Sequence, residues 1–147
     1  MELASTDLRA NKALIRRFVE EVFEGLKVEA VDELVADGFS SHTWPSATGD
    51  GKADLKAATE RISQALSEPE FKLEDMIAEG DRVAVRLTAS ATQIGEFMGM
   101  PPSGGRYTIG EIHVFRVTEG RIVEHWHQMD AMSMMAQLKD SEPQGPV

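Results

Sequence analysis

The residues best suited to chemistry gather in one predicted hairpin near the end of this 147-residue chain. Glu119 and Gly120 are the expected turn residues, so Thr118 should pair with Arg121 and set the register of both strands. One face would then mix ionisable groups with large apolar ones: Ile109, Glu111, His113, Phe115, Glu124, Trp126, Gln128 and Asp130. Such a mixture is typical of a ligand pocket, and the alternative is the wet rim of an ordinary sheet.

The opposite face of this hairpin would carry Ile112, Val114, Arg116, Val123, His125, His127 and Met129. His125 and His127 have a spacing that is seen in metal sites. In this register they point away from His113, and no third ligand is evident on their face, so no metal site is predicted. The exposed apolar side chains predict instead a homodimer that forms through this face. A slip of one residue would exchange the two faces.

Hydrophobic periodicity predicts the elements that position this hairpin. Apolar residues at helical spacing predict three N-terminal helices, at residues 7–25, about 31–38 and 52–67. Pro69 then forbids a continued helix, and the period changes to two. Strands are expected at residues 71–78, 82–94, 106–117 and 121–130, and residues 131–138 could form a last helical turn or two.

Helices followed by a run of antiparallel strands predict one α+β domain, in which the sheet buries one face against the helices. This domain should span residues 1–140. Residues 141–147 contain two prolines and a glycine and are expected to form a loose C-terminal tail.

Composition narrows the classes of function. The formal net charge of −10, from 25 acidic and 15 basic residues, disfavours binding to nucleic acid. The absence of cysteine excludes disulfides, thiolate metal sites and cysteine nucleophiles. No segment approaches the ~18 apolar residues of a membrane span. The N-terminus also lacks the apolar run of a signal peptide, so a cytoplasmic protein without membrane contact is expected.

Motifs in order along nearly the whole chain resemble the SnoaL-like polyketide cyclases, a branch of the nuclear-transport-factor-2-like superfamily. His42 and Pro45 match a histidine-then-proline loop of the family, and Gly49 or Gly51 matches the glycine that follows it. The other matching segments are residues 79–85, 95–102, 105–106, 115–117, 120–126, 130 and 137–138. This resemblance implies a cone-shaped, cystatin-like fold, with three N-terminal helices on a strongly bent antiparallel sheet.

The resemblance also implies an activity. In the family, an acidic residue four positions after the strand tryptophan acts as general acid/base in an intramolecular aldol ring closure, without a metal or organic cofactor. That position here is Asp130. A carboxylate in an apolar pocket is a stronger base than in water, since burial raises its pKa. His113 or His42 could donate to the enolate, and the substrate would be a small, apolar, polyketide-like carbonyl compound.

The walls of this expected pocket are the side chains of Trp126, Trp44, Phe18 or Phe23, Ile109, Gln128 and Glu111. Several alternatives stay open. The two tryptophans could be ordinary core residues, and Asp130 could simply cap the segment that begins at Ala131. The domain could also be an epoxide hydrolase or dehydratase, or a module that binds a small ligand without catalysis.

Overall fold

The computed structural model describes residues 7–44 and 46–140, so Pro45, residues 1–6 and the predicted tail at 141–147 lie outside the described residues. The first helix, α1 (Leu8–Phe18), begins where the Asp7 carboxylate accepts a hydrogen bond from the Ala10 N–H. It continues as a π-helical stretch, η1 (Val19–Glu24). The helices α2 (Val28–Leu34) and α3 (Gly51–Ala65) follow, and α4 (Ala131–Asp140) is the last helix described.

Five strands form one curved sheet. They are β1 (Val35–Ser41), β2 (Leu66–Glu79), β3 (Arg82–Gln93), β4 (Arg106–Thr118) and β5 (Arg121–Met129). Their order across the sheet is β1-β5-β4-β3-β2, and β1 pairs with β5 in parallel while the other neighbours are antiparallel. The α+β class and the three N-terminal helices are therefore confirmed, but the sheet is mixed rather than purely antiparallel.

The parallel edge strand β1 corrects the prediction that the second helix continues to Gly38. That helix ends at Leu34, and Val35 already belongs to the strand. The segment gives no strand signal because Asp37 and Gly38 are poor strand formers. Pairing with β5 holds it instead, and the next backbone N–H, that of His42, donates to the His125 carbonyl at 2.8 Å.

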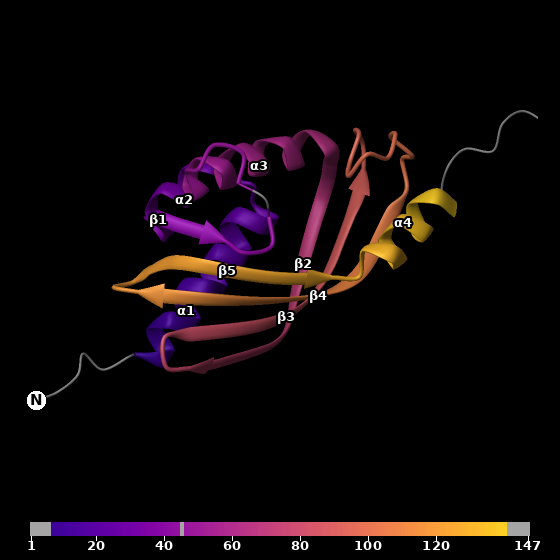
Figure 1. The fold of residues 1–147 in the computed structure, drawn as a ribbon. Coiled ribbons are helices and arrows are strands. Elements are labelled where there is room, and N and C mark those ends of the chain that lie inside the picture. The colour runs from indigo at the N-terminus through magenta and orange to yellow at the C-terminus, as the bar shows by residue number, and fades with distance from the viewer. Residues whose placement is uncertain (1–6, 45, 141–147) are drawn as a thin grey trace, which may run out of the picture.

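The helices α1, α2 and α3 lie against one face of the curved sheet, which we call the inner face (Figure 1). Buried residues on this side form two apolar clusters. Phe115 and Val117 of β4 belong to the cluster under the N-terminal helices. Tyr107 and Ile109 of the same strand belong to a second cluster that includes residues of α4. The inward positions between them on β4 are 111 and 113, so the polar residues there lie between two apolar cores.

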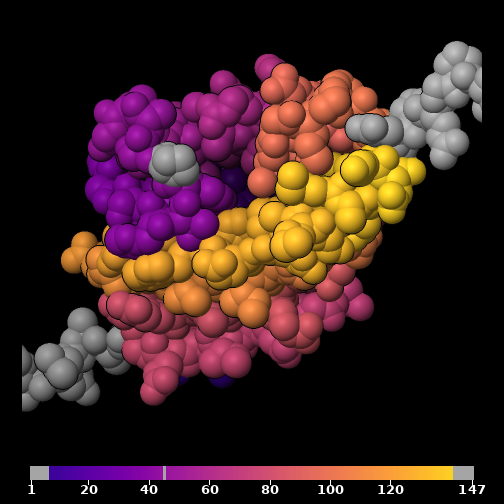
Figure 2. All heavy atoms as spheres, turned by 45° about the vertical axis from the view of Figure 1, so that its right-hand side comes forward, coloured from indigo at the N-terminus to yellow at the C-terminus, as the bar shows by residue number. Residues whose placement is uncertain are grey.

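Figure 2 shows a recess in the surface, bordered by the purple segment before α3, the orange loop between β3 and β4, and the yellow β5–α4 segment. Indigo atoms of the N-terminal helical segment are visible at its floor. Gln93 anchors the orange loop, because its buried side-chain amide donates to three loop carbonyls and accepts from Ser103. No helix in the described part of the chain is long and apolar enough to cross a membrane.

Candidate functional site

The β4–β5 hairpin contains a bulge that decides which side chains face inward. Glu119 and Gly120 both have positive φ, at 52° and 74°, and Thr118 pairs with Arg121 as predicted. Two positions later the register shifts, because Arg116 pairs with Glu124 and Val123 has no partner. A single extra residue in one strand moves every later residue to the opposite face.

The predicted faces of β5 are therefore wrong beyond the bulge. His125 and His127 point inward and are buried, with 1% and 8% of their surface exposed. His113 lies opposite His127, not opposite Trp126. The predictions for β4 hold, since Ile109, Glu111 and His113 are buried on the inner face.

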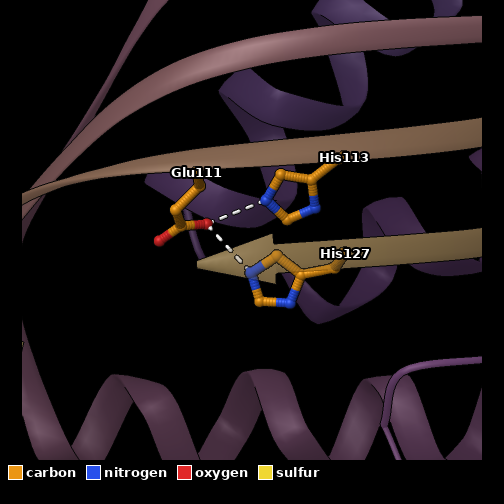
Figure 3. Close-up of side chains that lie close together, drawn as sticks. All are labelled: Glu111, His113 and His127. Atoms are coloured by element: carbon orange, nitrogen blue, oxygen red, sulfur yellow. Dashed lines mark hydrogen bonds and ion pairs between the residues drawn. The ribbon is translucent and has the colours of Figure 1, made fainter. Parts of the chain in front are cut away.

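Glu111, His113 and His127 form a compact cluster on this inner face, which we call the Glu–His cluster (Figure 3). The Glu111 Oε1 atom lies 2.8 Å from His113 Nε2 and 3.4 Å from His127 Nε2. The first contact is a hydrogen bond, whereas the second lacks hydrogen-bond geometry. Among the described residues, both ring nitrogens of His127 are buried without a hydrogen-bond partner. A buried polar side chain without a partner is uncommon and suggests that a ligand completes it.

A chain of hydrogen bonds supports the cluster from one side. His113 Nδ1 lies 2.9 Å from His125 Nε2, and His125 Nδ1 lies 3.0 Å from Ser41 Oγ. Ser41 Oγ also accepts hydrogen bonds from the backbone N–H groups of Thr43 and Trp44. The cluster is thus tied to the first residues after β1.

Burial sets the charge states of these groups. Burial acts to raise the pKa of Glu111, but the imidazoles of His113 and His127 outweigh it and lower this pKa to about 2. Burial lowers the pKa of His113, and it lowers the pKa of His125 to about 2. At neutral pH a carboxylate therefore faces neutral His113. Since an ionised carboxylate only accepts, His113 Nε2–H donates to Glu111, His125 Nε2–H donates to His113, and Ser41 donates to His125.

Aromatic side chains surround the cluster. The Phe23 ring, which η1 carries, lies 5.0 Å from the His113 ring, and the Trp44 ring lies 4.5 Å and 5.8 Å from the rings of His125 and His127. Burial, and then the negative charge of Glu111, raise the pKa of Tyr107 to about 12, so that its hydroxyl stays protonated. The site therefore combines apolar walls with one carboxylate, imidazoles and one hydroxyl.

The comparisons with known proteins agree with this architecture. The family model described as SnoaL-like polyketide cyclase matches residues 13–138. This chain belongs to the SnoaL-like polyketide cyclase family. It is 29% identical over 137 residues to the aklanonic acid methyl ester cyclase DauD of Streptomyces sp. strain C5, covering 88% of this chain and 82% of the relative.

Two solved structures show the same fold. TsrD from Streptomyces laurentii is 25% identical, with a TM-score of 0.83 and coverage of 91% of this chain and 98% of TsrD. IdmH from Streptomyces antibioticus is 28% identical, with a TM-score of 0.74 and coverage of 88% and 98%. Proteins of the SnoaL-like family bind small apolar substrates.

The acid that the resemblance to SnoaL-like cyclases had indicated, Asp130, does not lie in the site. It is exposed at the end of β5. Its Oδ1 atom accepts the Ser133 N–H at 3.1 Å, and its carbonyl accepts the Met134 N–H at 3.1 Å. These contacts are those of an N-cap, here the cap of α4. In this SnoaL-like chain the local geometry of Asp130 therefore gives it a structural role.

Three other predicted site residues lie on the outer face of the sheet. The His42 ring stacks on Trp126 with 4.8 Å between ring centroids, and its Nε2 lies 2.6 Å from Glu124 Oε2. Gln128 borders a shallow hollow with Arg86 on that face. The structure therefore does not bring His42, Trp126 or Gln128 together with His113, contrary to the prediction.

Phe18 is buried in the main apolar cluster, where its ring packs edge-on against Phe23 and Phe115. Sequence reasoning missed His127 because, in an uninterrupted hairpin, the partner of His113 is Trp126. The spacing of His125 and His127 was the available signal for a functional pair. The bulge that turns the pair inward has no distinct signal in the residues around Val123.

Proposed function

We propose that this chain is a cyclase that closes a ring in a small, apolar carbonyl compound by acid–base catalysis at the Glu–His cluster, without a cofactor. The relative DauD acts on aklanonic acid methyl ester, and we take that compound as the first candidate substrate. The observation that carries the proposal is His127, which is buried beside an ionised carboxylate and has no hydrogen-bond partner among the described residues.

The tautomer of His127 follows from its neighbour. Its Nε2 lies 3.4 Å from a carboxylate oxygen, and this contact is favourable when Nε2 carries the proton. The lone pair then resides on Nδ1, which is the nitrogen that accepts a proton from the substrate. Glu111 stabilises the imidazolium that forms, in the way a carboxylate supports the base histidine of a catalytic triad.

The reaction then needs no external reagent. His127 Nδ1 removes a proton from the carbon next to a carbonyl, and the enolate carbon attacks a second carbonyl of the same molecule. A carbon–carbon bond forms, and the imidazolium returns its proton to the new alkoxide oxygen. The protonated hydroxyl of Tyr107 is a candidate donor to the enolate oxygen, since it lies on the same inner face of β4.

Two alternative functions fit the geometry less well. The cap geometry of Asp130, taken alone, would favour a binding module without catalysis, but the Glu–His cluster supplies a different acid–base centre. A hydrolase with several convergent carboxylates is disfavoured, because Glu111 is the only carboxylate among the buried residues of the described chain.

The ring of the half-buried Trp44 lies against His127 of the Glu–His cluster and against His125, which supports the cluster. Both nitrogens of His127 are shielded from solvent. Substrate entry through the recess of Figure 2 therefore requires the segment that carries Trp44, or the loop between β3 and β4, to move aside.

The test of this function is turnover of aklanonic acid methyl ester by the wild-type chain and by two matched carboxamide variants. Glu111→Gln removes the buried charge that stabilises the imidazolium, and we expect kcat to fall by a factor on the order of 10² or more. Glu124→Gln removes a carboxylate from the outer face of the same sheet and should leave kcat unchanged. Equal activity of the Glu111→Gln variant and the wild type would refute the proposal.

A further inference from the structure

The Glu–His cluster has a property that ring closure by acid–base catalysis does not require. The cluster brings three groups that bind transition metals, two imidazoles and one carboxylate, to within 4.8 Å of one another. It does so in a buried place, since Glu111 is 8% exposed and His113 is 1% exposed. Two histidines and one carboxylate that leave a coordination position open are a common ligand set for catalytic zinc and for non-haem iron.

Two of the donor-atom separations are close to those expected around one shared ion. Two ligands at about 2.1 Å from a metal lie about 3.0 to 3.4 Å apart when their angle at the metal is between the octahedral and tetrahedral values. Glu111 Oε1 is 2.8 Å from His113 Nε2 and 3.4 Å from His127 Nε2. Both separations lie close to this range, and all three donor atoms lie within 4.8 Å of one another.

Charge and hydrogen bonding support the same conclusion. The buried Glu111 carboxylate lies within ion-pair distance of two imidazoles, those of His113 and His127, and of no lysine or arginine among the described residues. A cation can therefore bind beside this carboxylate without displacing a fixed counter-charge. The unpartnered Nε2 of His127 points at the same carboxylate oxygen.

A second shell of hydrogen bonds is already in place. Ligand histidines commonly donate their other ring N–H to an oriented acceptor. His113 Nδ1 faces His125 Nε2 at 2.9 Å, and His125 Nδ1 faces Ser41 Oγ at 3.0 Å. If the rings of His113 and His125 both exchange tautomers, His113 Nε2 presents its lone pair to the cluster, and the His113–His125 and His125–Ser41 hydrogen bonds are kept with their directions reversed.

We infer that Glu111, His113 and His127 bind one divalent transition-metal ion of the zinc type, and that this ion inhibits ring closure. The inhibitory half rests on the proposed function, whereas binding itself does not. Metal coordination needs the lone pair of His127 on Nε2, which places the proton on Nδ1. The nitrogen that would accept the substrate proton is then blocked, and the ion also occupies Glu111 Oε1.

The experiment uses the full chain without an affinity tag, stripped with a chelator and dialysed. Calorimetric titration with Zn²⁺ should give one bound ion per chain. Bound Co²⁺ should show the visible absorption that is typical of a low coordination number. His127→Gln should weaken Zn²⁺ binding by a factor on the order of 10² through the loss of one ligand. His42→Gln, which removes an exposed histidine from the outer face, should bind Zn²⁺ as the wild type does.

The outcomes separate this inference from the proposed function. Absence of Zn²⁺ binding overturns the inference, and so does unweakened binding by the His127→Gln variant. If His127→Gln does not fold by circular dichroism, Glu111→Gln serves in its place. Zn²⁺ binding without loss of turnover overturns the inhibitory half. If the wild type does not bind Zn²⁺ and the metal-free Glu111→Gln variant loses turnover, the proposed function stands and only the metal site is removed.

Discussion

The stability of the fold should fall as the solution becomes acidic, because the inner face buries neutral histidines. Burial lowers the pKa of His125 from 6.5 to about 2. Between these two values the unfolded chain binds a proton at this ring and the folded chain does not. The free energy of unfolding is therefore complete above the unfolded-state pKa and decreases as the pH falls below it.

The magnitude follows from the pKa difference. For each pH unit below the ordinary histidine pKa, a ring that stays neutral in the folded chain lowers the free energy of unfolding by about 1.4 kcal/mol. His125 alone therefore lowers it by about 2 kcal/mol between roughly pH 7.5 and pH 5. Burial lowers the pKa of His113 as well, which adds a loss of the same sign. Glu111 adds another loss only in more acidic solution, between its ordinary pKa of 4.5 and its folded value of about 2. For a domain whose total stability is typically about 5–15 kcal/mol, this is a measurable fraction.

Urea unfolding followed by tryptophan fluorescence at a series of pH values measures this effect. The variant His125→Gln should be less stable at neutral pH, because it breaks the link between Ser41 and His113. It should also show a shallower dependence of stability on pH. A wild-type free energy of unfolding that stays constant over this pH range would contradict the prediction, as would an unchanged slope in the variant. Either result would show that His125 is not held neutral in the folded chain.

Three further predictions concern the scaffold. Gly51→Ala would place a Cβ atom 2.1 Å from the Phe39 carbonyl oxygen; we expect a loss of about 1–3 kcal/mol, and an unchanged melting temperature would contradict it. Asp130→Ala should cost about 1 kcal/mol in urea unfolding by removing the cap of α4, and equal stability of the variant would argue against the cap. Ile112 on the outer face is 51% exposed, and we propose that this face forms a homodimer interface. Sedimentation should give twice the chain mass of 16.2 kDa, and the monomer mass would exclude this dimer.

Much of the fold was predictable because it follows from periodicity. The apolar stripe of the first helix, the stop before Pro69 and the turn at Glu119-Gly120 are local signals, and each produced the expected element. The edge strand β1 was not predictable in this way. Its residues have weak strand propensity, and its hydrogen bonds come from β5, which lies about eighty residues away in the sequence.

The site was predictable only in part, because one extra residue, Val123, forms a bulge in β5. Glu111, His113 and Ile109 were placed correctly because β4 is regular through these positions. His127 was placed on the wrong face because the bulge at Val123 inverts the rest of β5. Asp130 had the right residue type for both an acid and a cap, and only the bonds to the amides after it distinguish the two roles.

Proton transfer at His127 can be tested by one comparison of rates. Turnover of aklanonic acid methyl ester is measured for the wild type, His127→Gln and Asp130→Asn, each verified as folded and free of metal. We expect His127→Gln to lose a factor on the order of 10²–10⁴ in kcat, while Asp130→Asn, which preserves a good N-cap, keeps wild-type turnover. Loss of turnover in Asp130→Asn, with His127→Gln still active, would contradict this expectation.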